Sequence, residues 1–240
     1  MRINAEGMHF KTLNEQIRSS EDKELMIDNC NGQRYIGSGL GEKELIINGT
    51  PGNALGAYLD GCKIIVHGNA QDATGDTMND GSIVIHGSSG DATGYGMRGG
   101  KIFVRGDIGY RAGIHMKEYQ DKVPILVIGG TSGSFLGEYQ AGGTIIVLGL
   151  KTAGKNPVNF FCGTGMHGGR IFLRCEELPA DLPPQVIAAE ASAQDLLSIK
   201  NHLEEFCQLF DYDIKEVYAR PFYKLTPNSS SPYKQLYTAM

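Results

Sequence analysis

Two pairs of polar side chains recur at an interval of 19 residues, and they are the first candidates for chemistry. Asp72 and Asp91 each begin an Asp-Ala-Thr-Gly tetrapeptide, and His67 and His86 each end an apolar run. Two nearby carboxylates are the catalytic pair of retaining glycosidases, and two imidazoles can share a metal ion. We favour a structural interpretation of both pairs. The aspartates are expected to form turns that bond their own backbone, and the histidines have no third ligand in register.

Other sequence patterns that carry chemistry are missing. The five cysteines are widely spaced and form no Cys-x-x-Cys pair, which disfavours a zinc or iron–sulfur site and indicates a reduced, cytoplasmic protein. The sequence holds no P-loop, nucleophile elbow or HExxH helix. The glycine run at 37–41 precedes another strand rather than a helix, so it does not match a dinucleotide-binding loop. We therefore predict no catalytic residue, no bound cofactor and no metal ligand.

The composition limits the class of protein. The 240 residues include 33 glycines, which is about twice the usual share, but only 9 prolines. Lysine and arginine total 22 against 27 aspartates and glutamates, and the formal net charge of −5 argues against a nucleic-acid-binding surface. No apolar run reaches the roughly 18 residues of a membrane span, and the first 20 residues lack the apolar core of a signal peptide. A soluble globular protein is expected.

The glycines follow a repeat that predicts the fold. Four consecutive segments each begin with an apolar run that ends on a glycine, and a second glycine follows seven residues later. One such segment cannot bury a core alone, so the segments must stack at about 4.8 Å, with glycine at the tight corners. We predict an all-β fold, namely a right-handed, single-stranded parallel β-helix with about seven turns, followed by a C-terminal amphipathic helix and an extended tail. The structural repeat glycines are Gly49, Gly56, Gly68, Gly75, Gly87, Gly94, Gly106, Gly113, Gly129, Gly137 and Gly149.

Three segments are expected along the chain. They are an N-terminal arm at 1–20, the glycine-repeat β-helix domain at 21–178, and a C-terminal helix and extended tail at 179–240 that packs on the β-helix or on a partner. Glycines stop and prolines cluster at 176–184. A helix is predicted over 186–210, because its apolar residues recur at helical spacing and form one face. That face consists of Leu196, Ile199, Leu203, Phe206 and Phe210.

Aligning the repeats produces an apolar column on the outer side of the predicted strands. Alternate residues of a strand point to opposite faces, so Ile64 and Val66 fill the core while Ile65 points outward. A column of this length would be unusually large if it were left in water. The chain's own tail and a partner protein both remain open as its cover, beside plain exposure. The candidate interface consists of Ile46, Ile65, Val84, Phe103, Leu126, Ile146 and Phe172.

These patterns together resemble the C-terminal glycine-repeat domain, or GXGXG domain, of the glutamate synthase large subunit. The likeness starts at residues 24–40, ELMIDNCNGQRYIGSGL, and includes the repeats HGNAQDATGDTMNDG and IGGTSGSFLGEYQAGG. It extends into the tail segment HLEEFCQLFDYDIKEV. A similar glycine repeat occurs in the β-helical subunit of formylmethanofuran dehydrogenase, an enzyme of one-carbon metabolism. The start of the match and the tail favour the glutamate synthase branch.

The resemblance implies a structural subunit that is not catalytic alone. In that family the repeat domain packs between a glutamine amidotransferase domain, which releases ammonia, and an FMN/iron–sulfur domain, which uses it on 2-oxoglutarate. This sequence shows neither domain, so the resemblance implies separate glutamine amidotransferase and FMN/iron–sulfur glutamate synthase subunits as partners in glutamate biosynthesis. A homo-oligomer is a further alternative. The alternatives are a subunit of a formylmethanofuran dehydrogenase-like complex, an independent binding module and a cryptic hydrolase. No nucleic-acid or membrane partner is expected.

Overall fold

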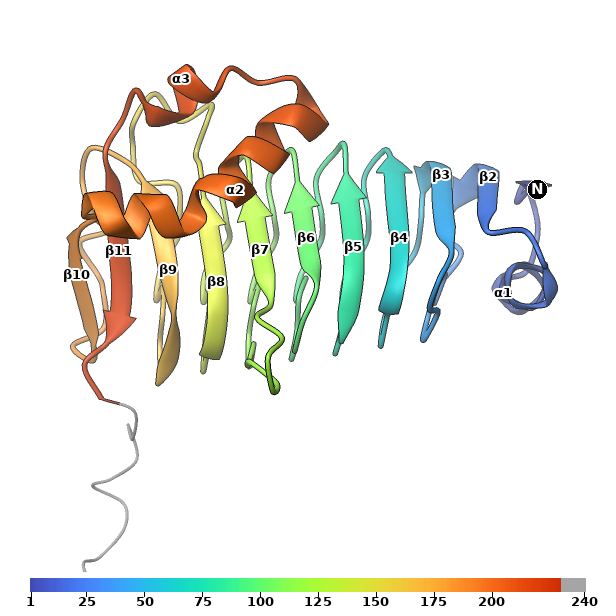
Figure 1. The fold of residues 1–240 in the computed structure, drawn as a ribbon, viewed down its shortest axis with the longest axis horizontal. Coiled ribbons are helices and arrows are strands. Elements are labelled where there is room, and N and C mark those ends of the chain that lie inside the picture. The colour runs from blue at the N-terminus through green and yellow to red at the C-terminus, as the bar shows by residue number, and fades with distance from the viewer. Residues whose placement is uncertain (230–240) are drawn as a thin grey trace, which may run out of the picture.

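The computed structural model describes residues 1–229, whose strands form one sheet (Figure 1). The order of the strands in this sheet is β1-β2-β3-β4-β5-β6-β7-β8-β9-β11-β10. The strands are β1 (Arg2–Asn4), β2 (Glu24–Asn31), β3 (Glu44–Thr50), β4 (Asp60–His67), β5 (Asp80–Ile85), β6 (Lys101–Val104), β7 (Ile125–Ile128), β8 (Ala141–Val147), β9 (Gly168–Arg174), β10 (Val186–Glu190) and β11 (Phe222–Pro227). The helices are α1 (Phe10–Ser19), α2 (Ala193–Phe210) and α3 (Ile214–Tyr218).

Equivalent residues of successive repeats pair with one another across the sheet. Leu45 of β3 pairs with Ile64 of β4, which pairs with Ile83 of β5, which pairs with Ile102 of β6. All four side chains are fully buried between the sheet and the loops that connect its strands. Because the repeat interval is 19 residues, equivalent residues of each strand lie side by side, and the inward columns of aliphatic side chains form the main core together with side chains of the loops.

The connecting loops also stack, and glycine is required where they turn. Gly75 has a φ of +69°, and a Cβ placed on it would lie 2.4 Å from Cδ1 of Ile102. Its N–H donates to the carbonyl of Leu55, one repeat earlier, at 2.8 Å. The same bond recurs one repeat later, from the N–H of Gly94 to the carbonyl of Thr74. Each loop therefore rests on the loop before it, and a side chain at the corner would enter the core.

The prediction of a right-handed parallel β-helix with about seven turns is wrong. The structure has a single mixed sheet, in which β1 to β9 are parallel and β10 and β11 run antiparallel to their neighbours. Between the strands, the stacked loops contribute only isolated bridges, such as Ala70 with Ser89, and not further strands. The glycine interval indicated where strands recur, but it contains no information about strand direction outside the repeat.

The predicted arrangement of a C-terminal helix followed by an extended tail is wrong as well. Residues 186–190, which were expected to be helical, form β10, and α2 begins only after a capping box made by Ser192 and Asp195. After α3, residues 222–227 form β11, which inserts between β9 and β10. The segment therefore closes the sheet. The part of the predicted tail at 230–240 lies outside the described residues, and the division into three segments stays a prediction.

A second core lies on the outer face of the sheet, under α2. Figure 1 shows this helix lying across the sheet near β7, β8 and β9. Ile199, Leu203 and Phe206 of α2 are fully buried against outward residues of these strands, among them Val127 and Phe172. Within residues 1–229, no helix has the length and apolar character needed to cross a lipid bilayer.

Candidate functional site

The two repeated aspartates serve the backbone of the next repeat. Oδ1 of Asp72 accepts a hydrogen bond from the N–H of Asp91 at 2.9 Å, and Oδ1 of Asp91 accepts one from the N–H of Tyr110 at 2.8 Å. The bonds thus run between repeats, and the expectation that each aspartate bonds its own backbone is wrong. A Cβ on Gly90 would lie 2.2 Å from Oδ1 of Asp72, so a glycine leaves room for this carboxylate.

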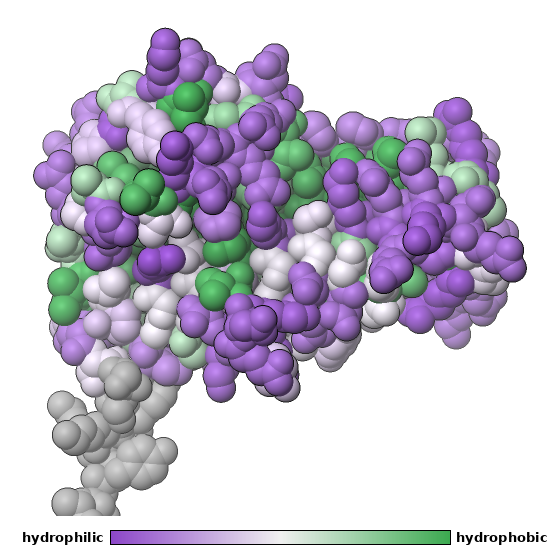
Figure 2. Space-filling view, viewed as in Figure 1, coloured by the Kyte–Doolittle hydropathy of each residue, from purple (hydrophilic) through white to green (hydrophobic). Residues whose placement is uncertain are grey.

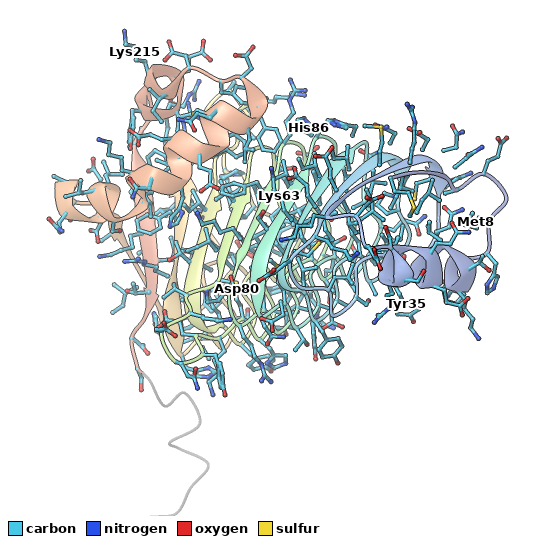
Figure 3. The ribbon with its side chains drawn as sticks, turned by 45° about the vertical axis from the view of Figure 1, so that its right-hand side comes forward. Met8, Tyr35, Lys63, Asp80, His86 and Lys215 are labelled. Atoms are coloured by element: carbon cyan, nitrogen blue, oxygen red, sulfur yellow. The ribbon has the colours of Figure 1, made fainter. Side chains whose placement is uncertain are left out.

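The two repeated histidines are packed against each other and against the end of α2. The ring centroids of His67 and His86 are 4.8 Å apart, and those of His86 and Phe210 are 5.2 Å apart in an edge-to-face arrangement. Figure 3 shows His86 near the end of α2, above the strands. Burial, followed by the charges of His67 and Arg105, lowers the pKa of His86. No cluster of three or more metal-ligating side chains occurs among residues 1–229.

The thiols of the chain are buried and reduced. Burial raises the pKa of each, to about 12 for Cys62 and Cys162 and to about 11 for Cys30 and Cys175. The pKa of Cys207 is also raised, first by burial and then by nearby carboxylates. Since the thiolate is the nucleophile and the metal ligand, these five side chains are core residues in the folded protein.

The outward apolar column differs from the prediction at one position. Ile46, Ile65, Val84 and Phe103 pair in sequence across β3 to β6, but the next residue in the column is Val127. Leu126 pairs instead with Ile102 and lies in the inner core. The interval between the glycines before and after this point exceeds 19 residues, because the loop at 117–124 is longer. The repeat alignment therefore placed Leu126 one residue out of register.

Helix α2 covers most of this column and leaves one end open. Phe103, Ile146 and Phe172 are fully buried beneath it, whereas Ile46 and Ile65 are only partly buried. Figure 2 shows apolar surface continuing to the right of the helix, over β5 to β3. The chain's own C-terminal segment is thus the main cover, and an interface at the open end stays a prediction.

A group of aromatic side chains stands on the opposite side, on the stacked loops. Tyr110 contacts Phe135 at 5.4 Å between ring centroids, and Phe135 contacts Phe161 at 4.9 Å. Phe160 and Phe161 are 64% and 49% exposed, so the rings present a broad apolar area to solvent. We call this group the aromatic surface, and it consists of Tyr95, Tyr110, His115, Phe135, Tyr139, Phe160 and Phe161.

Arg111 holds part of the aromatic surface in place. Its guanidinium carbon lies 4.9 Å from the ring centroid of Tyr110 and 5.6 Å from that of Phe135. Its Nε lies 2.8 Å from Oε2 of Glu138, whose side chain is buried. A cation between two rings and a carboxylate fixes the rings relative to each other. Tyrosine, tryptophan and arginine dominate the binding energy of protein–protein interfaces, and this surface together with Arg111 supplies two of the three.

Sequence reasoning missed the aromatic surface, although a signal was present. The loop tetrapeptide that reads Asp-Ala-Thr-Gly at 72–75 and 91–94 becomes Tyr-Arg-Ala-Gly at 110–113, Ser-Phe-Leu-Gly at 134–137 and Phe-Phe-Cys-Gly at 160–163. Phe135 and Phe161 occupy the left-handed position of the loop, at φ values of 62° and 63°. The repeats at 54, 73 and 92 have alanine there, and the repeat at 111 has arginine. Large residues at a strained position indicate a role for their side chains.

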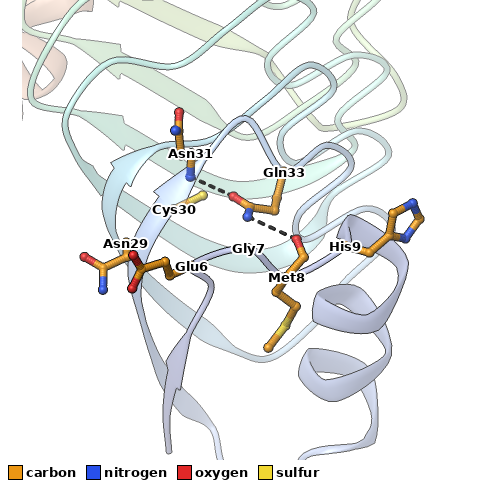
Figure 4. A pocket seen from close by; sticks show the side chains of 8 residues that line it. All are labelled: Glu6, Gly7, Met8, His9, Asn29, Cys30, Asn31 and Gln33. Carbon is orange, nitrogen blue, oxygen red and sulfur yellow. Dashed lines mark hydrogen bonds between the residues drawn. The ribbon is translucent and has the colours of Figure 1, made fainter.

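A cavity of about 690 Å³ lies at the N-terminal end of the sheet (Figure 4). Part of its polar lining is bonded within the fold. The side-chain amide of Gln33 donates to the carbonyl of Met8 and accepts from the N–H of Asn31. Cys30, which also lines it, is buried with a raised pKa. These groups are satisfied within the fold, so the cavity shows no arrangement that would select a ligand.

The repeated glycines, the stacked loops and the single sheet identify the class of protein. The model of the GXGXG motif family matches residues 16–229, and the chain belongs to this family. The resemblance to the GXGXG domain is thus confirmed. An uncharacterized protein of Methanocaldococcus jannaschii is 47% identical over 249 residues, which cover 98% of this chain and 95% of that protein.

A solved structure has the same fold. It comes from the formyltransferase/hydrolase complex of Methylorubrum extorquens in complex with methylofuran, and the match has a TM-score of 0.61. The match covers 91% of this chain and 88% of that chain, at 17% sequence identity. At this identity the likeness shows the fold, and function has to be argued from the residues.

Proposed function

We propose that this chain is a structural subunit, not catalytic alone, of a glutamate synthase-type complex. Its partners are a glutamine amidotransferase subunit and an FMN/iron–sulfur glutamate synthase subunit. Family membership and the sequence resemblance to the glutamate synthase domain support the branch. The observation that carries the proposal is a contrast between the reactive side chains and the aromatic surface. The side chains suited to chemistry are bonded or buried within the fold, while an ordered aromatic surface faces solvent.

The first half of that contrast concerns the groups a reaction would need. Asp72 and Asp91 accept hydrogen bonds from backbone N–H groups, His86 packs beneath Phe210, and the thiols are buried. Each of these groups would have to leave a structural contact before it met a substrate. Their arrangement therefore favours a supporting role for the chain.

The second half concerns the aromatic surface. Each apolar side chain that becomes buried contributes roughly 1.5–3 kcal/mol, so Tyr110, Phe160 and Phe161 could together drive association. The ion pair of Arg111 and Glu138 fixes the neighbouring rings before a partner arrives, which reduces the entropy lost on binding. We propose this surface as the place where a partner subunit of the complex docks.

Affinity capture tests the proposal. The tagged chain, expressed in cells of its source, is expected to recover the glutamine amidotransferase and the FMN/iron–sulfur protein in amounts comparable to its own. The double variant Tyr110→Ser/Phe161→Ser is expected to lose most of this recovery. Leu197→Ser removes an apolar side chain of α2 that is 60% exposed and serves as the control. Recovery of neither protein by the unaltered chain would contradict the proposed function.

A second candidate is a structural subunit in a one-carbon complex. The observation that favours it is the fold shared with a chain of the formyltransferase/hydrolase complex. The same capture experiment distinguishes the two candidates, because it would then recover formyltransferase-type or molybdenum- or tungsten-enzyme subunits.

A further inference from the structure

We infer that two copies of this chain associate through the outer edge of β10, so that one sheet runs through both. The inference starts from the order of strands, in which β10 is the last. No other strand of residues 1–229 pairs with its outer side. Figure 2 shows apolar surface at this end of the molecule, over β10.

The pairing with β11 shows which backbone groups of β10 face this open edge. The N–H of Asn228 donates to the carbonyl of Gln185, and the N–H of Ala191 donates to the carbonyl of Phe222, each at 2.8 Å. Hydrogen-bonded and non-hydrogen-bonded pairs alternate along an antiparallel ladder. Ile187 and Ala189 therefore bond to β11, and the N–H and C=O of Ala188 and Glu190 point away from it.

The edge has few of the features that usually prevent strand association, and its charged residue, Glu190, is the last of the strand. Exposed edge strands are protected by proline, lysine, bulges or short length. β10 has five residues, no proline and no lysine, and its Ile187 is 52% exposed. The opposite edge is different, since β1 has only three residues and carries Arg2 in an ion pair with Asp28. Of the two edges of the sheet, only the one at β10 is therefore open to association.

The sequence of β10 is complementary to itself in an antiparallel arrangement. A two-fold axis at Ala188 places this residue opposite Ala188 of the second copy, where the two exchange backbone hydrogen bonds. Ile187 then lies opposite Ala189 of the second copy, a large side chain beside a small one. Glu190 lies opposite Val186 and not opposite another glutamate, so no like charges meet.

One backbone hydrogen bond is available at each end of this pairing. The N–H of Val186 already donates to the carbonyl of Pro183 at 2.9 Å, which leaves its own carbonyl as the group available at the edge. In the proposed register that carbonyl meets the N–H of Glu190 from the second copy. The Glu190 carbonyl has no donor in this register, because the Val186 N–H is already used, so the occupant is argued from the side-chain complementarity of β10 with itself.

Light scattering after gel filtration of the purified chain tests the inference. The expected mass is twice the 26.0 kDa of one chain. Ala188→Pro removes an edge N–H while sparing the bonds to β11, and Ile187→Lys places a lysine on the edge. Each is expected to raise the dimer dissociation constant roughly tenfold or more. Tyr58→Lys changes a residue that is 58% exposed on the loops, and it is expected to leave the dimer intact.

Cross-linking tests the register. Under mild oxidation Ala188→Cys is expected to form a disulfide-linked dimer, because equivalent residues meet at the axis within disulfide range. Ile187→Cys is the matched control and is expected to stay uncross-linked, because Ile187 lies opposite Ala189 of the second copy. The five native thiols are buried and should not take part in cross-linking. A monomeric unaltered chain, a dimer indifferent to Ala188→Pro and Ile187→Lys, or equal cross-linking of both cysteine variants would overturn the inference. A mass that doubles only after removal of residues 230–240 would assign the edge to the chain's own terminus and would also overturn it. None of these outcomes bears on the capture experiment, which concerns the aromatic surface.

Discussion

The carboxylate of Asp72 and the backbone N–H of Asp91 are joined by a 2.9 Å hydrogen bond, although they belong to different repeats. Asp91 repeats the arrangement with Tyr110. Side chains of one repeat thus satisfy the backbone of the next, in addition to the bonds between strands. The stability of each repeat depends on the presence of the one before it.

The corner glycine should matter more than this carboxylate. Gly75→Val places a branched side chain at positive φ and against Ile102, so we expect a loss of about 2–5 kcal/mol in the free energy of unfolding. Asp72→Ala removes one hydrogen bond at the surface and should cost about 0.5–1.5 kcal/mol. Urea unfolding monitored by circular dichroism compares the two. Coincident midpoints would contradict the stacking described above.

The burial of α2 can be tested by truncating one side chain. Phe206 is fully buried in the outer core, and Phe206→Ala should lower the free energy of unfolding by about 3–5 kcal/mol. Leu197 lies on the same helix and is 60% exposed. Leu197→Ala should change the stability by about 0.5 kcal/mol or less. Thermal unfolding of both variants provides the measurement, and equal losses would be inconsistent with the packing of α2.

The start of α2 should make stability depend on pH. Hydrogen bonds from Lys224 and then from Ser192 lower the pKa of Asp195 from 3.8 to about 2. A carboxyl group with a lowered folded-state pKa contributes stability above its unfolded pKa, and this contribution is lost as the pH falls through the folded value. Melting temperatures should therefore decrease between pH 3.8 and about 2, and Asp195→Asn should show a smaller decrease. Identical slopes for the two proteins would rule out this contribution.

The thiols should be unreactive while the chain is folded. All five are buried, and burial raises the pKa of Cys62 and Cys162 to about 12. At pH 8 an aromatic disulfide reagent should therefore modify fewer than one thiol per chain in minutes, and all five once denaturant is added. A rapidly modified cysteine in the native protein would indicate an exposed thiolate and would reopen the question of catalysis.

The glycine repeat predicted the strands and their pairing where its period is regular. Leu45, Ile64, Ile83 and Ile102 align in the structure as they do in the sequence, because equal intervals require equal register. The alignment failed at Leu126, where a longer loop precedes β7. Period alone cannot place a strand beyond an insertion.

Features that depend on contacts between distant segments could not be predicted in this way. β11 pairs with β9 and β10, and its position follows from packing of the C-terminal segment, not from any local pattern at 222–227. The aromatic surface has a local signal in the tetrapeptide at 160–163, but the rings become one surface only when the loops stack. Resemblance to a known domain identified the family, and the residues that could bind a partner required the structure.

The equal repeats of this sheet also bear on how such a chain can evolve. Duplication of the DNA for one 19-residue repeat adds a strand whose residues already match both neighbours, and lengthens the molecule by about 4.8 Å. The two ends, α1 with β1 and β10 with β11, are unaffected by such an event. Helix α2 keeps its 18 residues, about 27 Å, so every added repeat extends the outer apolar column beyond its cover. In this fold, growth by duplication therefore creates new surface for binding without any change in the existing core.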